Sequence, residues 1–461
     1  MTIPLHYQSI TEIAPRIAAR ELTAVALTEA YLGRIEELNS SLHAVVETTA
    51  DGALEAAAQA DREIGAGNYR GPLHGIPFAL KDNFDTAGVH TTACSKLFLD
   101  RVPERDSAVA ERFKQAGAVL VAKLTMSELA MVGAPGYGEE ARNPWNLEHA
   151  PGWSSSGSGV AVAAGLCAVS MGTDSGGSVR FPASANSVVG LLPSFGRVSR
   201  HGLIPLTGSI DFAGPLTRCV RDSALVLGTI AGHDSRDPGS ANEPVPDFCA
   251  ALDGGIKGLR VGVVQQDGDG WHPDVLERVA SAIGQLETLG ASLHDVQLPL
   301  VEHAHIAGSI IYLTEGFEIY QQQLRQRSQD IGPVFRMYGK LGGLFSAADY
   351  IKAQQFRSRL KKEVAKLFES VDVLALPVSN TPARRLADFD PFVLSDGIRS
   401  GATEVFNLVG TPALSVPCGF SADGLPIGLQ LVARKFDEST LFNTALAYEQ
   451  TQTWHTRHPP I

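Results

Sequence analysis

The chain has 461 residues, of which 44% are hydrophobic and 19% are charged, and this composition excludes disorder, collagen and a coiled coil as descriptions of the whole chain. The formal net charge is −12. Without runs of Lys or Arg, the chain lacks the positive surface of a protein that binds nucleic acid or an anionic membrane. The sequence therefore predicts a globular protein with neither of these partners.

Cysteine usage and the N-terminus indicate the compartment. The five cysteines are far apart and form no CxxC pair, which is typical of reduced thiols in a cytoplasmic protein. The first twenty residues contain Glu12 and no apolar core, so they do not form a secretory signal. The apolar run 160–171 is too short to cross about 30 Å of hydrocarbon, so a buried helix is predicted there.

The first 70 residues predict helices. Ser9 and Glu12 have the spacing of a capping box. Apolar residues recur at helical spacing over 27–38, and 53–64 is rich in alanine.

From residue 70 onward, strands and helices alternate. A short apolar run, 78–80, leads into Lys81. The segment 106–116 predicts a helix that ends at Gly117, and 118–122 predicts a buried strand. This order predicts an α/β layer protein with partly parallel strands.

The same pattern returns after a Pro-rich linker at 233–247. Strands are predicted at 259–264 and 371–376, the second ended by Pro377, with a helix at 273–289 ended by Gly290. The run 406–430 reads as strands that return to the main sheet. We expect one large domain over 1–461, with a catalytic core at about 65–232 and 401–461 and a peripheral lobe at about 248–400.

No metal or cofactor motif is present. His303 and His305 are the closest histidine pair, and without a third ligand they indicate a solvated or core pair. The glycine-rich dinucleotide fingerprint fails because Val162 stands where it needs glycine. Neither Ser154 nor Ser178 has the Gly-x-Ser-x-Gly frame of a Ser-His-Asp hydrolase.

One segment combines many backbone N–H groups with little side-chain bulk. Its residues are Asp174, Ser175, Gly176, Gly177 and Ser178. Such a turn can direct N–H donors at an oxyanion, and Ser178 at its end could be a nucleophile. The alternative is an ordinary Gly/Ser loop that caps a helix.

A serine nucleophile needs a base, and Lys81 is the candidate because it follows an apolar strand. Burial disfavours the ammonium form, so the pKa of a buried lysine can fall from about 10.4 to near 7. The alternative is a lysine paired with Asp82 or Asp85 at the strand end.

Several ordered motifs resemble the amidase signature family. They occupy 75–83, 142–145, 154–158, 172–184, 196–199, 214–218, 407–420 and 424–430. The resemblance is strong over about 70–230 and 405–461. It implies an α/β fold with a mixed central β-sheet covered by helices on both faces, amide hydrolysis and no cofactor.

The resemblance also implies the site residues. Ser178 would be the nucleophile, Lys81 the base, and Ser154 a bridging serine on a cis peptide bond. The backbone amides of Ser175, Gly176, Gly177 and Ser178 would form the oxyanion hole. Asp174 and Arg180 would be a buried pair that holds the turn, with Ser155 and Ser156 in support.

The chain departs from the family at Trp153, where glycine is usual before the bridging serine. Trp153 and Tyr137 are the expected pocket-lining residues. The aromatic residues Tyr312, Phe317, Tyr320 and Phe335 could line the pocket, although core packing is the simpler interpretation of each.

These observations lead to the prediction of a stand-alone cytoplasmic hydrolase that acts on a small-molecule carboxamide, with a homodimer expected from the family. The segment 394–407 resembles stand-alone amidases. The alternative is the glutamine-hydrolysing A subunit of a tRNA-dependent amidotransferase complex, which shares the fold and the triad.

Overall fold

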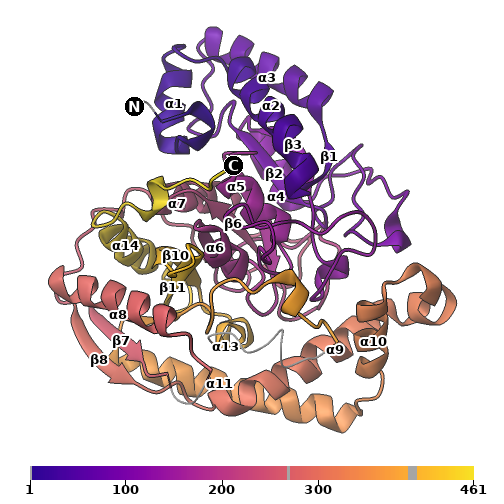
Figure 1. Cartoon of the computed structure of the whole chain (residues 1–461), viewed down its shortest axis with the longest axis vertical. Helices are drawn as coiled ribbons and strands as arrows, with labels where there is room; N and C mark the ends of the chain where they lie inside the picture. Colours follow the sequence, from indigo (N-terminus) through magenta and orange to yellow (C-terminus); the bar gives the residue numbers. More distant parts are fainter. Residues whose placement is uncertain (1–2, 267–269, 393–401) are drawn as a thin grey trace.

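The computed structural model describes residues 3–266, 270–392 and 402–461 (Figure 1). Its centre is an 11-stranded sheet in the order β1-β3-β2-β4-β6-β5-β10-β11-β9-β7-β8. The strands are β1 Val45–Thr48, β2 Pro77–Lys81, β3 Val119–Leu124, β4 Val169–Asp174, β5 Val189–Leu192, β6 Phe212–Thr217, β7 Arg260–Val264, β8 Ser292–Val296, β9 Val373–Pro377, β10 Ala413–Phe420 and β11 Pro426–Ala433. Strands β2, β3 and β4 pair in parallel, as do β7, β8 and β9, and the remaining pairs are antiparallel.

Helices cover both faces of the sheet. They are α1 Ile10–Ala18, α2 Ala24–Leu42, α3 Ala50–Gly65, α4 Ala108–Gln115, α5 Ser156–Ala163, α6 Arg180–Asn186, α7 Val220–Ile230, α8 Pro273–Thr288, α9 Val301–Gln326, α10 Pro333–Gly342, α11 Ala347–Ser370, α13 Thr403–Val409 and α14 Glu438–Glu449. Short 3-10 helices lie at Leu5–Tyr7, Lys96–Phe98, Glu128–Ala130, Ser328–Asp330, Leu386–Asp388 and Trp454–Thr456.

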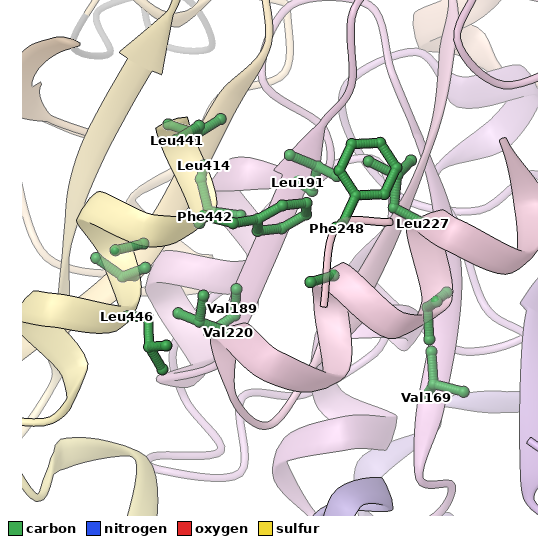
Figure 2. Packing of buried hydrophobic residues seen from close by; sticks show 14 of the residues in the cluster. Val169, Val189, Leu191, Val220, Leu227, Phe248, Leu414, Leu441, Phe442 and Leu446 are labelled. Atoms are coloured by element: carbon green, nitrogen blue, oxygen red, sulfur yellow. The ribbon is translucent and has the colours of Figure 1, made fainter. Parts of the chain in front are cut away.

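Side-chain alternation along β9 shows why both faces are covered. Val373 and Ala375 join the core cluster that includes α7, α8 and α14, while Leu374 and Leu376 join the cluster that includes α9, α11 and α13. Figure 2 shows Phe442 of α14 in the first of these clusters. The predicted mixed sheet with helices on both faces is confirmed.

Several predicted element ends are also present. Ser9 and Glu12 form a reciprocal capping box at the start of α1. Gly117 and Gly290 follow α4 and α8 with φ of +80° and +98°, a region that favours glycine. Pro377 is the last residue of β9.

The predicted helix over 160–171 is wrong. Helix α5 ends at Ala163, Gly165 follows with φ of +71°, and β4 begins at Val169. The whole stretch is buried, so its apolar composition does not distinguish a helix from a strand.

The arrangement of β2 and β4 brings the candidate residues together. These strands are parallel neighbours, with Leu80 opposite Met171. Their carboxyl ends therefore meet at one edge, where Lys81 and Asp174 are the last residues. Lys81 lies two residues after Ala79, whose side chain packs on the face covered by α5.

The expected peripheral region contributes β7, β8 and β9 to the same sheet, and β7 and β8 lie at the lower left of Figure 1. Strand β9 pairs directly with β11, so the sheet is continuous across the expected boundary. The division into core and lobe stays a prediction.

Among the described residues, no helix has the length and hydropathy needed to cross a membrane.

Candidate active site

Lys81 is fully buried at the end of β2. Its Nζ donates to Ser154 Oγ at 2.7 Å, Ser155 Oγ at 3.0 Å and Thr173 Oγ1 at 2.8 Å. Burial lowers the pKa of Lys81 to about 7. An amine with this pKa can accept and return a proton near neutral pH.

The neighbouring carboxylates have other partners. Asp82 pairs with Lys123 at 3.1 Å, and Asp85 pairs with Arg101 at 2.6 Å. Within the described residues, Lys81 forms no ion pair. The alternative of a strand-end lysine held by Asp82 or Asp85 is therefore excluded.

The serine-rich run lies beside Lys81, just before and at the start of α5. The Trp153–Ser154 peptide bond is cis. Ser155 Oγ donates to the carbonyl of Thr173 at 3.0 Å, and its backbone N–H donates to the carbonyl of Ser178 at 3.3 Å. These contacts hold Ser154 between the lysine and the turn after β4. Ser156 is the first residue of α5.

Ser178 lies in the turn between β4 and α6 and lines a cavity. Its hydroxyl makes no hydrogen bond within the described parts of the chain. Ser154, the bridging serine that the sequence predicts, contacts Lys81. A proton relay from Ser178 would close when a substrate is bound, since catalytic hydrogen bonds are often long in a free enzyme.

The turn after Asp174 departs from the predicted oxyanion hole at Gly177. The Gly177 N–H donates to Asp174 Oδ1 at 2.6 Å, so this amide is already engaged and does not fit the predicted role. Gly177 has φ of +132°, and a Cβ there would lie 2.3 Å from the Phe181 ring. Glycine is therefore required by the turn. The amides of Ser175, Gly176 and Ser178 have no acceptor among the described residues.

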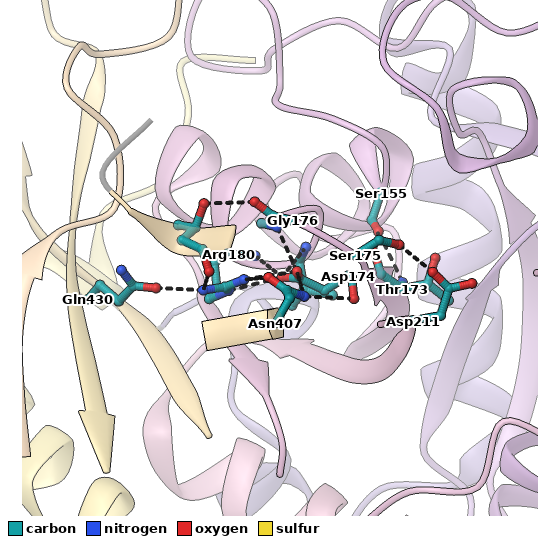
Figure 3. Close-up of polar contacts among 12 residues, drawn as sticks. Ser155, Thr173, Asp174, Ser175, Gly176, Arg180, Asp211, Asn407 and Gln430 are labelled. Atoms are coloured by element: carbon teal, nitrogen blue, oxygen red, sulfur yellow. Dashed lines mark hydrogen bonds and ion pairs between the residues drawn. The ribbon is translucent and has the colours of Figure 1, made fainter. Parts of the chain in front are cut away.

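A buried polar network holds this turn (Figure 3). The guanidinium of Arg180 lies 2.9 Å from the carboxylate of Asp174, and both side chains are fully buried. Burial opposes ionisation of Asp174, but the Arg180 guanidinium and the hydrogen bonds prevail and lower the pKa of this carboxyl. Arg180 also donates to Asn407 Oδ1 at 2.6 Å and to Gln430 Oε1 at 2.7 Å.

Sequence reasoning missed three members of the site. Asn407 and Gln430 lie in motifs that resemble the family, but the motifs alone assign no role to their side chains. Asp211 accepts from Ser175 Oγ at 2.5 Å and from the amides of Leu206 and Thr207. Burial raises the pKa of Asp211.

The cavity above Ser178 opens to solvent, and its space amounts to about 730 Å³ with the solvent-open part included. Trp153 lines it, as expected, and so does Tyr312, for which core packing was the simpler interpretation. Tyr137 is absent from the lining, and its hydroxyl hydrogen bonds with Thr92, so the structure does not bring it to this cavity. Tyr320 and Phe335 are buried core residues.

A second cavity, of about 590 Å³, lies beside the first. Trp153 and Phe181 line both, so they form the shared wall. The Trp153 ring stacks on Phe389, with ring centroids 4.1 Å apart.

No group of three or more metal-ligating side chains is found within the described ranges. His303 and His305 each lie 3.6 Å from a carboxylate, that of Glu302 and that of Glu404 respectively.

A sequence model of the Amidase family matches residues 26–442. The chain belongs to the amidase family. It is 39% identical to the A subunit of the glutamyl-tRNA(Gln) amidotransferase of Thermosynechococcus vestitus, over 98% of this chain and 99% of that protein. The peptide amidase of Stenotrophomonas maltophilia superposes with a TM-score of 0.87 at 33% identity, covering 99% of each chain. The glutamyl-tRNA(Gln) amidotransferase A subunit from Thermotoga maritima gives 0.81 at 28% identity, covering 98% of this chain and 96% of that one.

These relatives overturn two predictions. The stand-alone hydrolase of a small carboxamide is wrong, because full-length relatives at 38–40% identity are described as the A subunit of a glutamyl-tRNA(Gln) amidotransferase. The prediction of no nucleic-acid partner is wrong for the same reason. Net charge describes the surface of one chain and not what other subunits of a complex bind. The expected homodimer also conflicts with these relatives, which are named as one subunit of an amidotransferase.

The segment 394–407 favoured the stand-alone interpretation. Residues 394–401 of it lie outside the described residues. The likeness over full chain length outweighs this short segment.

Proposed function

We propose that this chain is the glutamine-hydrolysing A subunit of a tRNA-dependent amidotransferase. The observation that carries the proposal is the 38–40% identity to proteins of that description over nearly the full length of both chains. In this function the chain releases ammonia from the side-chain amide of glutamine, and partner subunits use it on glutamyl-tRNA(Gln). The reduced cysteines support a cytoplasmic location.

The chemistry begins with Ser178. Its Oγ attacks the amide carbonyl carbon while its proton passes through Ser154 to Lys81. The contact of 2.7 Å between Lys81 Nζ and Ser154 Oγ supports this order. The lowered pKa of Lys81 makes the amine available as the base.

The tetrahedral oxyanion would be held by backbone N–H groups of the turn, from Ser175, Gly176 and Ser178. One such donor typically contributes about 100- to 1000-fold to the rate. Lys81 then returns the proton through Ser154 to the nitrogen, and the C–N bond breaks to release ammonia. Water attacks the resulting γ-glutamyl ester by the same relay, which frees glutamate and restores Ser178.

The net charge of −12 fits a division of labour within the complex. A chain with this charge repels phosphate, so the tRNA would be held by partner subunits and not by this surface. This chain would supply only the nitrogen.

The test is reconstitution with the partner subunits encoded in the same genome. We expect co-purification, and ammonia release from glutamine that increases when the partners and glutamyl-tRNA(Gln) are present. Ser178→Ala should abolish the release while leaving the complex assembled. Failure to bind those subunits would overturn the proposal. So would a rate of glutamine hydrolysis that is the same with and without them.

A further inference from the structure

The cavity above Ser178 is largely apolar, with one exception. Of the described residues that line it, Glu404 alone carries a formal charge. The apolar residues that line the same cavity include Met131, Leu206, Ile210 and Leu408. A carboxylate in such a wall loses hydration, so its presence calls for a partner.

Glu404 is held close to the nucleophile turn. The preceding residue, Thr403, donates its hydroxyl to the carbonyl of Gly176 at 2.7 Å, and its own carbonyl accepts from Arg180 at 2.8 Å. A Cβ placed on Gly176 would lie 3.9 Å from Glu404 Cβ. The first turn of α13 therefore fixes Glu404 beside the turn that carries Ser178.

The carboxylate of Glu404 is also available. Neither oxygen accepts a hydrogen bond from the residues that the structure describes. The His305 Nδ1 lies 3.6 Å from Glu404 Oε1, which is longer than a charge-assisted hydrogen bond. Gly308 faces Oε2 without a side chain, and a Cβ there would be 3.8 Å away.

The position of this charge has a consequence for catalysis. Negative charge develops on the substrate oxygen beside Gly176 as the tetrahedral intermediate forms, and a nearby carboxylate repels it. An amide that brings no cation to this carboxylate would therefore react slowly. A substrate that brings a cation to Glu404 would cancel the repulsion.

We propose that Glu404 binds a primary ammonium group on the acyl part of the substrate. The preferred substrate class is then a carboxamide whose acyl chain carries an amine, and in glutamine this group is the α-ammonium. The inference rests on the proposed amide hydrolysis at Ser178 and adds the group that selects the substrate.

The test compares Glu404→Gln with the unchanged protein at pH 8. Two substrate pairs differ only by the amine: glutamine with 4-carbamoylbutanoate, and 5-aminopentanamide with pentanamide. We expect kcat/KM to fall about 10- to 100-fold for the amino-bearing member, mainly through KM. For the member without the amine, kcat/KM should stay constant or rise. Equal effects on both members of a pair would overturn the proposal.

Glu302→Gln is the matched control. Glu302 lies on α9, and its Oε1 is also 3.6 Å from a histidine nitrogen, that of His303, but both side chains are largely exposed. This variant should leave every rate unchanged. A change that matches Glu404→Gln would assign the effect to surface charge and overturn the proposal.

A second readout separates this inference from the proposed function. A fluorophosphonate probe labels an activated serine without needing an amide substrate, so it also reports whether Glu404→Gln keeps an intact site. Pentylamine should slow labelling of Ser178 in the unchanged protein and not in the variant. Protection without glutamine hydrolysis would retain the ammonium site and reject the proposed function. Absence of protection would reject the site.

Discussion

The side chain of Lys81 is buried and yet its amine is fully provided with hydrogen-bond partners. It is fully buried, and its polar contacts are mainly hydroxyl groups, from Ser154, Ser155 and Thr173. Hydroxyl groups satisfy a neutral amine as well as an ammonium. The carboxylates of Asp211 and Asp174 favour the charged form, but the loss of hydration outweighs them and lowers the pKa of Lys81. The residue is thereby suited to exchange protons.

This environment predicts the pH dependence of the reaction. Because the pKa of Lys81 is lowered to about 7, the amine is protonated below that pH and cannot accept the proton of the nucleophile. We expect kcat/KM for amide hydrolysis to rise with pH through about 7 and then level off. The rate of Ser178 labelling should follow the same curve. A rate that is flat from pH 6 to pH 8 would show that another group is the base.

At this scale the sequence predicts residues that local motifs mark and misses those that act over long separations. Lys81 and Ser154 lie in motifs that resemble the family. Asp211 contacts Ser175 over 36 positions, and Asn407 contacts Asp174 over 233. A local pattern contains no information on such pairings, so only the fold reveals them.

At the scale of elements, the β4–turn–α6 unit depends on anchors from elsewhere. Helix α6 spans Arg180–Asn186, and Arg180 is tied to α13 and β11. Such a short helix is marginal by itself. Its position is therefore set by the Asp174–Arg180 pair and the residues around it.

Loss of the Asp174 charge should destabilise the protein strongly. Asp174→Asn leaves the Arg180 guanidinium buried without a counter-charge, which typically costs about 3–5 kcal/mol. We expect this loss in the free energy of unfolding, measured with urea, together with loss of Ser178 labelling.

Asp330→Asn is the control for this change. Asp330 pairs with Arg327 at the same 2.9 Å, but the two side chains are 31% and 49% exposed. An exposed pair contributes about 1 kcal/mol or less. Similar losses for the two variants would show that burial does not determine the strength of the Asp174 pair.

Elements with an explicit end signal were predictable from sequence. Gly117 and Gly290 mark helix ends because their positive φ favours glycine. Within 160–171 the same signal, Gly165, is masked by a uniformly apolar stretch. Periodicity does not separate a buried helix from a buried strand, and β4 was missed for this reason.

Across the whole molecule, one sheet joins the parts that the sequence divides. Strand β9 lies between β11 and β7, so the segment 248–400 shares its sheet with the C-terminal strands. Separated from β11, the edge of β9 would expose unpaired backbone groups and apolar side chains.

We therefore expect residues 248–400, expressed alone, to lack a cooperative unfolding transition. Circular dichroism and urea unfolding measure this, with the full chain as the control. A stable fragment with a sigmoidal transition would show that the lobe is an independent domain. The α/β class was predictable from the alternation of elements, whereas the likeness to a subunit of a complex was not, since no residue pattern in one chain states its partners.

The order of the sheet also bears on synthesis at the ribosome. Strands β10 and β11 come last in the chain but lie in the interior of the sheet, where β10 pairs with β5. A nascent chain thus carries Ser178 long before Asn407 and Gln430 emerge to brace it. A prematurely terminated product would lack the contacts of Asn407 and Gln430 with Arg180, so we expect it to be inactive.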